Sequence, residues 1–166
     1  MDFDHLHVYA ADPTATCHFW QQVLGAEAVG DIPNAFGGHN HVLLLGGQYL
    51  VVSAFPPDTL PGTPGAVADG ALTGGWGVAH LGLNVPALAP VIARLEAAGV
   101  HVHSAPRGTG PIRYVYFTAP DGVVVELTQY AVRRRLRPAL FLLRGFNRGV
   151  HAARRVIGRA LVRAAT

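Results

Sequence analysis

Several features that would define a membrane or secreted protein are missing from this sequence. Cys17 is the single cysteine among 166 residues, which excludes an internal disulfide. No apolar run approaches the roughly 20 residues that span a bilayer. The first residues are acidic and polar, so we expect no secretory signal. These absences favour a protein of the cytoplasm.

Lysine is also missing, and the charges are unevenly spread. All 13 cationic residues are arginine, and ten of them lie between Arg133 and Arg163. All ten acidic residues lie within residues 1–130, where only Arg94, Arg107 and Arg113 oppose them. The overall charge of +3 is therefore an average of an acidic body and a strongly basic tail.

Internal repetition is the main positive feature. His5 opens the segment His5-Leu6-His7-Val8, and His80 opens a similar alternating segment 75 positions later. Each segment leads into a small-residue turn and then a helix that ends at a glycine, Gly25 or Gly99. The predicted order is a strand at 3–10, a helix at 13–24 and strands at 26–32, 39–45 and 48–55, then a strand at 77–85, a helix at 87–98 and strands at 100–105, 112–118 and 122–129.

This order predicts an α+β fold made of two βαβββ modules, at about 3–55 and 77–130, within a domain of residues 1–130. The linker 56–76 is rich in proline and glycine, and it is either a plain connection or a flap near a pocket. Residues 131–166 form an Arg-rich helical extension, because apolar residues recur there at three- and four-residue steps between arginines. The extension is one amphipathic helix or two helices broken near Gly145–Gly149.

The repeated module, with His5, His80 and a Glu126 that follows Tyr116-Phe117-Thr118-Ala119-Pro120-Asp121-Gly122, resembles the vicinal oxygen chelate superfamily. That superfamily includes glyoxalase I, methylmalonyl-CoA epimerase, fosfomycin-resistance transferases, bleomycin-resistance proteins and type I extradiol dioxygenases. The resemblance covers residues 3–130. It implies that the strands form a cup-shaped mixed sheet with a metal inside.

The resemblance also implies a metal site with four positions, of which His5, His80 and Glu126 fill three. The fourth falls at Val51, where glyoxalase I and the epimerase carry a carboxylate or amide. Two histidines and one carboxylate leave adjacent positions open, which is typical of non-haem Fe(II) oxygenases. A divalent metal is therefore expected, with Fe(II) favoured and Mn(II), Ni(II) or Zn(II) as alternatives.

Three further residues are candidates for catalysis. His7 lies two residues from His5 and therefore on the same strand face. Its possible roles are a base, an alternative metal ligand or a polar residue that lines the site. His41 could face the cup from its strand. Tyr116 matches the tyrosine of the extradiol signature, although the histidine which that signature places upstream is missing from residues 107–109.

These features predict a metal-dependent enzyme that acts on a small molecule with two vicinal oxygens, and ring-cleaving dioxygenation is the favoured reaction. The alternatives are a glyoxalase- or epimerase-type lyase or isomerase, and a non-catalytic binding protein like those of bleomycin resistance. A homodimer is the expected assembly. The tail could dock on the acidic body of its own chain or of a partner subunit, which needs the fewest assumptions. It could also attach peripherally to an anionic membrane, and nucleic acid is the least favoured partner.

Overall fold

The structure of the protein is a computed structural model. It describes residues 4–55, 67–68, 71–72, 80–108, 112–130 and 137–165. The chain divides into two compact units, Met1–Pro61 with Pro138–Thr166 and Gly62–Arg137, which are described separately below. Most of the predicted linker 56–76 lies outside the described residues, except for the paired strands β5 (Val67–Ala68) and β6 (Ala71–Leu72).

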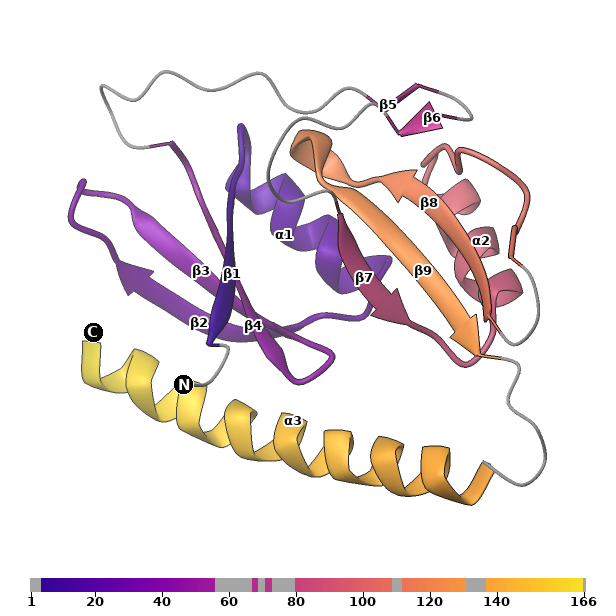
Figure 1. The fold of residues 1–166 in the computed structure, drawn as a ribbon. Helices are drawn as coiled ribbons and strands as arrows, with labels where there is room; N and C mark the ends of the chain where they lie inside the picture. The colour runs from indigo at the N-terminus through magenta and orange to yellow at the C-terminus, as the bar shows by residue number, and fades with distance from the viewer. Residues whose placement is uncertain are drawn as a thin grey trace. The chain divides into compact units, whose positions relative to one another are not determined.

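The first unit contains a four-stranded mixed sheet and two helices (Figure 1). Its elements are β1 (His5–Tyr9), α1 (Pro13–Gln22), β2 (Glu27–Pro33), β3 (His39–Leu45), β4 (Gln48–Ser53) and α3 (Arg137–Ala165). The strand order is β1-β4-β3-β2, with β1 parallel to β4 and the other pairs antiparallel. Helix α1 begins where the Asp12 carboxylate accepts a hydrogen bond from the Ala15 amide, 3.0 Å away, as an N-cap does.

The strand register of this sheet separates two faces. His5 pairs with Tyr49 and His7 with Val51, and paired residues carry their side chains on the same face. The opposite face carries Val8, Leu43 and Val52, which are buried on the side where α1 packs on β3 and β4. Trp20 of α1 is fully buried. The two predicted histidines of β1 therefore lie on the face away from α1.

The second unit repeats this plan with β7 (Leu81–Asn84), α2 (Leu88–Ala97), β8 (Ile112–Thr118) and β9 (Val124–Tyr130). Its strand order is β7-β9-β8, with β7 parallel to β9, which matches β1-β4-β3 of the first unit. Leu95 of α2 and the strand residues Val115, Phe117, Val125 and Leu127 are fully buried. The predicted α+β fold with two related modules is confirmed.

One detail of the prediction is wrong. No strand forms at 100–105: an isolated bridge joins Val102 to Phe117 there, and a second one joins Arg107, just beyond this segment, to Tyr114. Between these two bridges lie four residues on one side (103–106) and two on the other (115–116), and Pro106 has no N–H to donate, so a regular ladder cannot continue. For the tail, the sequence left one helix or two as alternatives, and the structure has one continuous helix, α3.

Helix α3 docks on the first unit through its last four turns. Val162 packs against the cluster of Val29, Val42 and Leu44 on the face away from α1. The Tyr49 hydroxyl donates to the carbonyl of Arg154, and the Arg154 guanidinium lies over the Tyr49 ring, 5.4 Å from its centroid. The tail therefore docks on its own chain, the first of the alternatives above.

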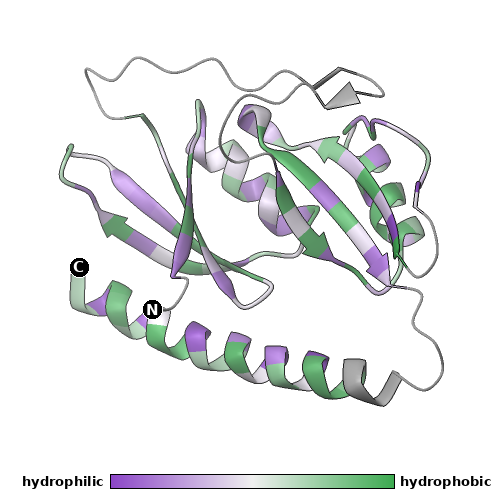
Figure 2. Ribbon diagram, viewed as in Figure 1, coloured by the Kyte–Doolittle hydropathy of each residue, from purple (hydrophilic) through white to green (hydrophobic). Residues whose placement is uncertain are grey.

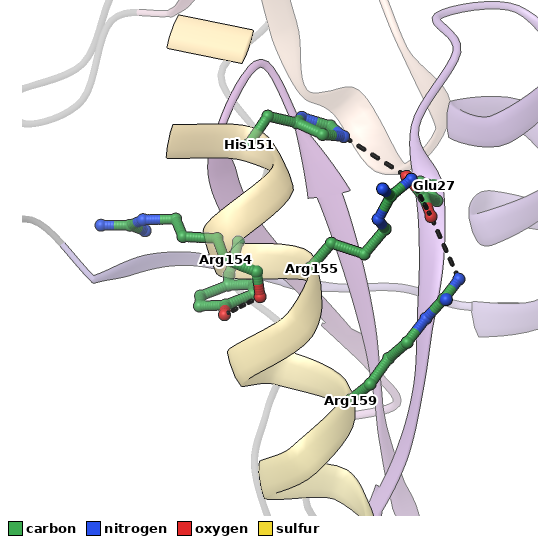
Figure 3. A network of polar contacts seen from close by, with 6 residues as sticks. Glu27, His151, Arg154, Arg155 and Arg159 are labelled. Carbon is green, nitrogen blue, oxygen red and sulfur yellow. Dashed lines mark hydrogen bonds and ion pairs between the residues drawn. The ribbon is translucent and has the colours of Figure 1, made fainter. Parts of the chain in front are cut away.

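The Glu27 carboxylate supplies negative charge to this contact. Glu27 of β2 lies 3.1 Å from Arg159, 3.3 Å from His151 and 3.5 Å from Arg155, all on α3 (Figure 3). Hydrophilic and hydrophobic segments alternate along α3 in Figure 2, as expected for a helix with one face on a protein surface. None of the helices in the described residues has both the length and the apolar content needed to cross a membrane.

Candidate metal site

The second unit brings His80, Glu126 and Tyr116 together. His80 directly precedes β7, while Glu126 in β9 pairs with Gly82 on one side and with Tyr116 on the other. Since residues two apart on a strand share a face, all three side chains lie on the face opposite the buried core. His80 Nε2 lies 3.2 Å from one Glu126 carboxylate oxygen. The Tyr116 hydroxyl donates a hydrogen bond of 2.8 Å to the other oxygen.

This cluster is partly shielded from water. The Glu126 side chain is 19% exposed and that of His80 is 29% exposed. Burial, together with the hydrogen bond to Glu126, raises the pKa of Tyr116 to about 12. Tyr116 is therefore a neutral hydrogen-bond donor at physiological pH. His80 Nδ1 is buried with no hydrogen-bond partner among the described residues.

The His80–Glu126 pair fits a divalent metal in chemistry and in spacing. Two ligand atoms that each lie about 2.1 Å from one metal ion are roughly 3.0 Å apart at a right angle and roughly 3.4 Å apart at a tetrahedral angle. The 3.2 Å between His80 Nε2 and the Glu126 carboxylate lies between these values, and it also suits a direct ion pair. Among the described residues, no group of three His, Cys or acidic side chains gathers to form a complete site.

His5, the third predicted ligand, belongs to the first unit with His7. Its Nδ1 lies 2.8 Å from the Asp4 carboxylate. His7 forms a hydrogen bond of 2.8 Å between its Nε2 and the Ser53 hydroxyl. The ring centroids of His5 and His7 are 6.3 Å apart. Burial and the neighbouring His5 lower the pKa of His7, which favours the neutral imidazole. Val51, at the predicted fourth position, pairs with His7 and so lies on the face that carries both histidines.

His41 lies on the other face of the same sheet. It pairs with Val52, whose side chain points to the α1 side, and its Nδ1 lies 2.8 Å from the Asp31 carboxylate. The register therefore separates His41 from His5 and His7. Alternation along a single strand cannot reveal which of its two faces is the inner one, and this is why the sequence left His41 as a candidate.

Beside His7 lies a small pocket that the sequence did not indicate. Its volume is about 300 Å³, and it is lined by His7, Tyr9, Asn40, Ser53, Ala54 and residues 33–36. Ser53 is 2% exposed and holds His7 by the hydrogen bond described above. The sequence signal that could have indicated this pocket is Ser53, which lies two residues beyond Val51 on the same strand face. The pocket offers an imidazole, an amide and aromatic rings to a small ligand.

Comparison with known families identifies the class of this chain. Residues 2–127 match the family model of the Glyoxalase/Bleomycin resistance protein/Dioxygenase superfamily. The chain therefore belongs to this superfamily, and the resemblance inferred from the sequence is confirmed. The name itself covers both enzymes and resistance proteins.

Three individual proteins similar to this chain are each less than 30% identical to it. The virulence protein STM3117 of Salmonella typhimurium is 27% identical over 135 residues, which are 76% of this chain and 83% of that protein. TnmS3, an antibiotic binding protein from Streptomyces sp. CB03234, has a similar fold, with a TM-score of 0.58 and 23% identity over 78% of this chain and 96% of that chain. The fosfomycin resistance protein FosX of Listeria monocytogenes, in complex with Mn(II) and 1S,2S-dihydroxypropylphosphonic acid, has a TM-score of 0.57 and 18% identity, with 82% and 96% of the two chains covered. At these identities the structures show a shared fold.

Proposed function

We propose that the protein is a divalent-metal enzyme that acts on a small molecule with two vicinal oxygens. The observation that carries the proposal is the pairing of His80 with Glu126 at 3.2 Å, with Tyr116 hydrogen-bonded to the same carboxylate. Two residue types that bind divalent metals converge there in a partly buried position. The resemblance to the superfamily implies His5 as a third ligand.

Each residue has a distinct part in the proposed site. His80 and Glu126 would hold the ion, with His5 as the further ligand that the resemblance implies, and the ion would supply a Lewis acid for two adjacent substrate oxygens. Tyr116 orients the Glu126 carboxylate by donating to it, as hydrogen-bonded neighbours of metal ligands commonly do. His7 has a lowered pKa and is thus a neutral proton acceptor near pH 7. Ser53 fixes the orientation of the His7 ring.

The finer part of the proposal is the reaction. A ligand set of two histidines and one carboxylate suits Fe(II) and ring-cleaving dioxygenation, which is the reaction we favour. Lyase or isomerase chemistry is the neighbouring alternative. The molecule bound in FosX is a 1,2-diol and its metal is Mn(II), which supports a substrate with vicinal oxygens and leaves both metals as candidates.

Metal content of anaerobically purified protein tests the site. We expect about one divalent ion per chain, and a large loss of metal in His80→Ala, Glu126→Gln and His5→Ala. His101→Ala and Glu96→Gln, at exposed positions of the second unit, are matched controls that should keep the metal. A wild-type protein that binds no metal at micromolar concentration would refute the site. Oxygen uptake by the Fe(II) form with catechols separates dioxygenation from lyase or isomerase chemistry.

A second candidate function is ligand binding without turnover. It is favoured by the pocket beside His7, whose lining includes the rings of Tyr9 and Phe36 and does not involve the His80–Glu126 pair. The fold is also that of TnmS3, which is an antibiotic binding protein. Under this alternative, a ligand should bind equally well to the wild type and to Glu126→Gln. Calorimetric titration of both proteins with the same ligand distinguishes the two functions.

A further inference from the structure

Helix α3 has an outer apolar face that its docking on the first unit leaves exposed. The docked side is marked by Gly158, which is buried against Val29 and Tyr49, and by Val162, which packs on the sheet. At about 100° per residue, six large apolar side chains fall on the remaining side of the helix. We call them the outer apolar face: Leu142, Leu143, Phe146, Val156, Ile157 and Leu161, each between 53% and 70% exposed.

Arginines line one edge of this face. Arg148, Arg159 and Arg163 fall between the docked side and the outer apolar face on the same helical projection. The helix contains no acidic residue, although it is 29 residues long. A helix with a strongly apolar side, an arginine-rich edge and low overall hydrophobicity is typical of segments that lie in the plane of a membrane interface. Long arginine side chains can place their charge at the headgroups while their stems stay in apolar surroundings.

The charges argue against a second copy of α3 as the occupant. Helices that pair through an apolar seam usually carry opposite charges beside the seam, which set the pairing. Here the arginine edge of one copy would find no acidic partner on the other copy, because α3 has no acidic side chain to offer. An occupant that is both apolar and anionic satisfies the whole surface. A bilayer of anionic phospholipid has these two properties.

We propose that the outer apolar face of α3 docks on the surface of an anionic phospholipid bilayer, while the opposite side of the helix stays on the sheet of the first unit. The Glu27 contacts with Arg155 and Arg159 hold the helix to the sheet from that side (Figure 3). Docking therefore needs no release of α3. The proposal concerns a different surface from the proposed metal site and does not depend on it.

Sedimentation of the full-length protein with vesicles tests this proposal. We expect binding to vesicles of phosphatidylcholine mixed with phosphatidylglycerol, little binding to phosphatidylcholine alone, and weakening by salt. The double variant Phe146→Gln/Ile157→Gln should bind at least about tenfold more weakly, since both side chains contribute buried apolar area. Phe36→Gln/Ile112→Gln is the matched control, because those residues are 60% and 44% exposed elsewhere in the chain. It should bind like the wild type.

A second pair of variants tests the charge. Arg148→Gln/Arg163→Gln should lower the vesicle affinity by about fivefold per arginine removed, whereas Arg94→Gln/Arg113→Gln in the second unit should not. Circular dichroism confirms that each variant is folded.

Three outcomes would overturn the proposal. The first is no sedimentation of the wild type with anionic vesicles, and the second is equal binding to both vesicle types. The third is a dimer in light scattering that Phe146→Gln/Ile157→Gln dissociates while vesicle binding is absent. The third outcome would assign the outer apolar face to a second copy of the chain.

Discussion

Substitution of Gly158 measures how closely α3 approaches the first sheet. A Cβ atom at this position would lie 2.8 Å from a Val29 methyl group and 2.9 Å from the Tyr49 ring, both inside van der Waals contact. Neither neighbour can easily move, because valine is stiff at χ1 and the Tyr49 hydroxyl is held by the Arg154 carbonyl. Gly149 of the same helix provides the matched control, because a Cβ atom there would meet no such neighbour within 4 Å.

The two substitutions differ only in this contact. Gly→Ala in an exposed helix stabilises a protein by about 1 kcal/mol, which is the expectation for Gly149→Ala. Gly158→Ala gains the same propensity but adds overpacking of about 1–3 kcal/mol. We therefore expect Gly158→Ala to be less stable than Gly149→Ala by about 1–3 kcal/mol in urea unfolding followed by circular dichroism. Equal stabilisation by both substitutions would refute the close packing of α3 on Val29 and Tyr49.

Three further predictions concern the candidate site. The absorbance of Tyr116 should titrate near pH 12. The free energy of unfolding should fall as pH rises from about 10 to 12, because the folded state keeps the phenol proton longer than the unfolded state does. Glu126→Gln should lower the pKa of Tyr116 only partly, since burial is the largest cause of its shift. His7 should titrate below its ordinary value of 6.5 in NMR, and its contribution to stability should be present above pH 6.5 and lost as pH falls, so a midpoint at or above 6.5 would contradict its environment. Val51→Glu should fold and gain stability on Mn(II) addition, by about 2.7 kcal/mol at a hundredfold excess over Kd. Val52→Glu, on the fully buried opposite face, should unfold with no metal rescue, and identical behaviour of the two variants would place Val51 away from the ligand face.

Local patterns were sufficient to predict most of the fold. Asp12 and Pro13 fix the start of α1, and the alternation around Val8 and Val52 identifies strands with one buried face. Whether residues 100–105 form a strand depends on how they pair with β8, and the alternation of the sequence alone does not reveal the register of that pairing. The close approach of α3 to Val29 and Tyr49 at Gly158 is a tertiary contact, which local glycine propensity cannot indicate.

The sequence predicted which residue types form the candidate site, but only partly which side chains contact one another. His80 was predicted from its match to His5 in the repeat and Glu126 from its place in the closing strand of the second module, and the structure places them 3.2 Å apart. The hydrogen bond of His7 with Ser53 joins residues 46 positions apart, so it depends on the parallel pairing of β1 with β4. His41 was ambiguous because two adjacent strands must be aligned before a face can be assigned.

The docking of α3 and the placement of His5 are physically linked. The Arg154 guanidinium donates to the backbone carbonyl of Asp4 at 3.0 Å and to the Gln48 side chain at 2.7 Å. Asp4 in turn holds His5 through its carboxylate, and Gln48 begins the strand that pairs with β1. An arginine of the tail therefore braces the start of the strand that carries the proposed ligand. Because a ligand must be held in place to bind metal well, we expect a change in the position of α3 to affect His5 through the contacts of Arg154 with Asp4 and of Asp4 with His5. This linkage gives the basic tail a role in the first unit even when its outer face is occupied by another surface.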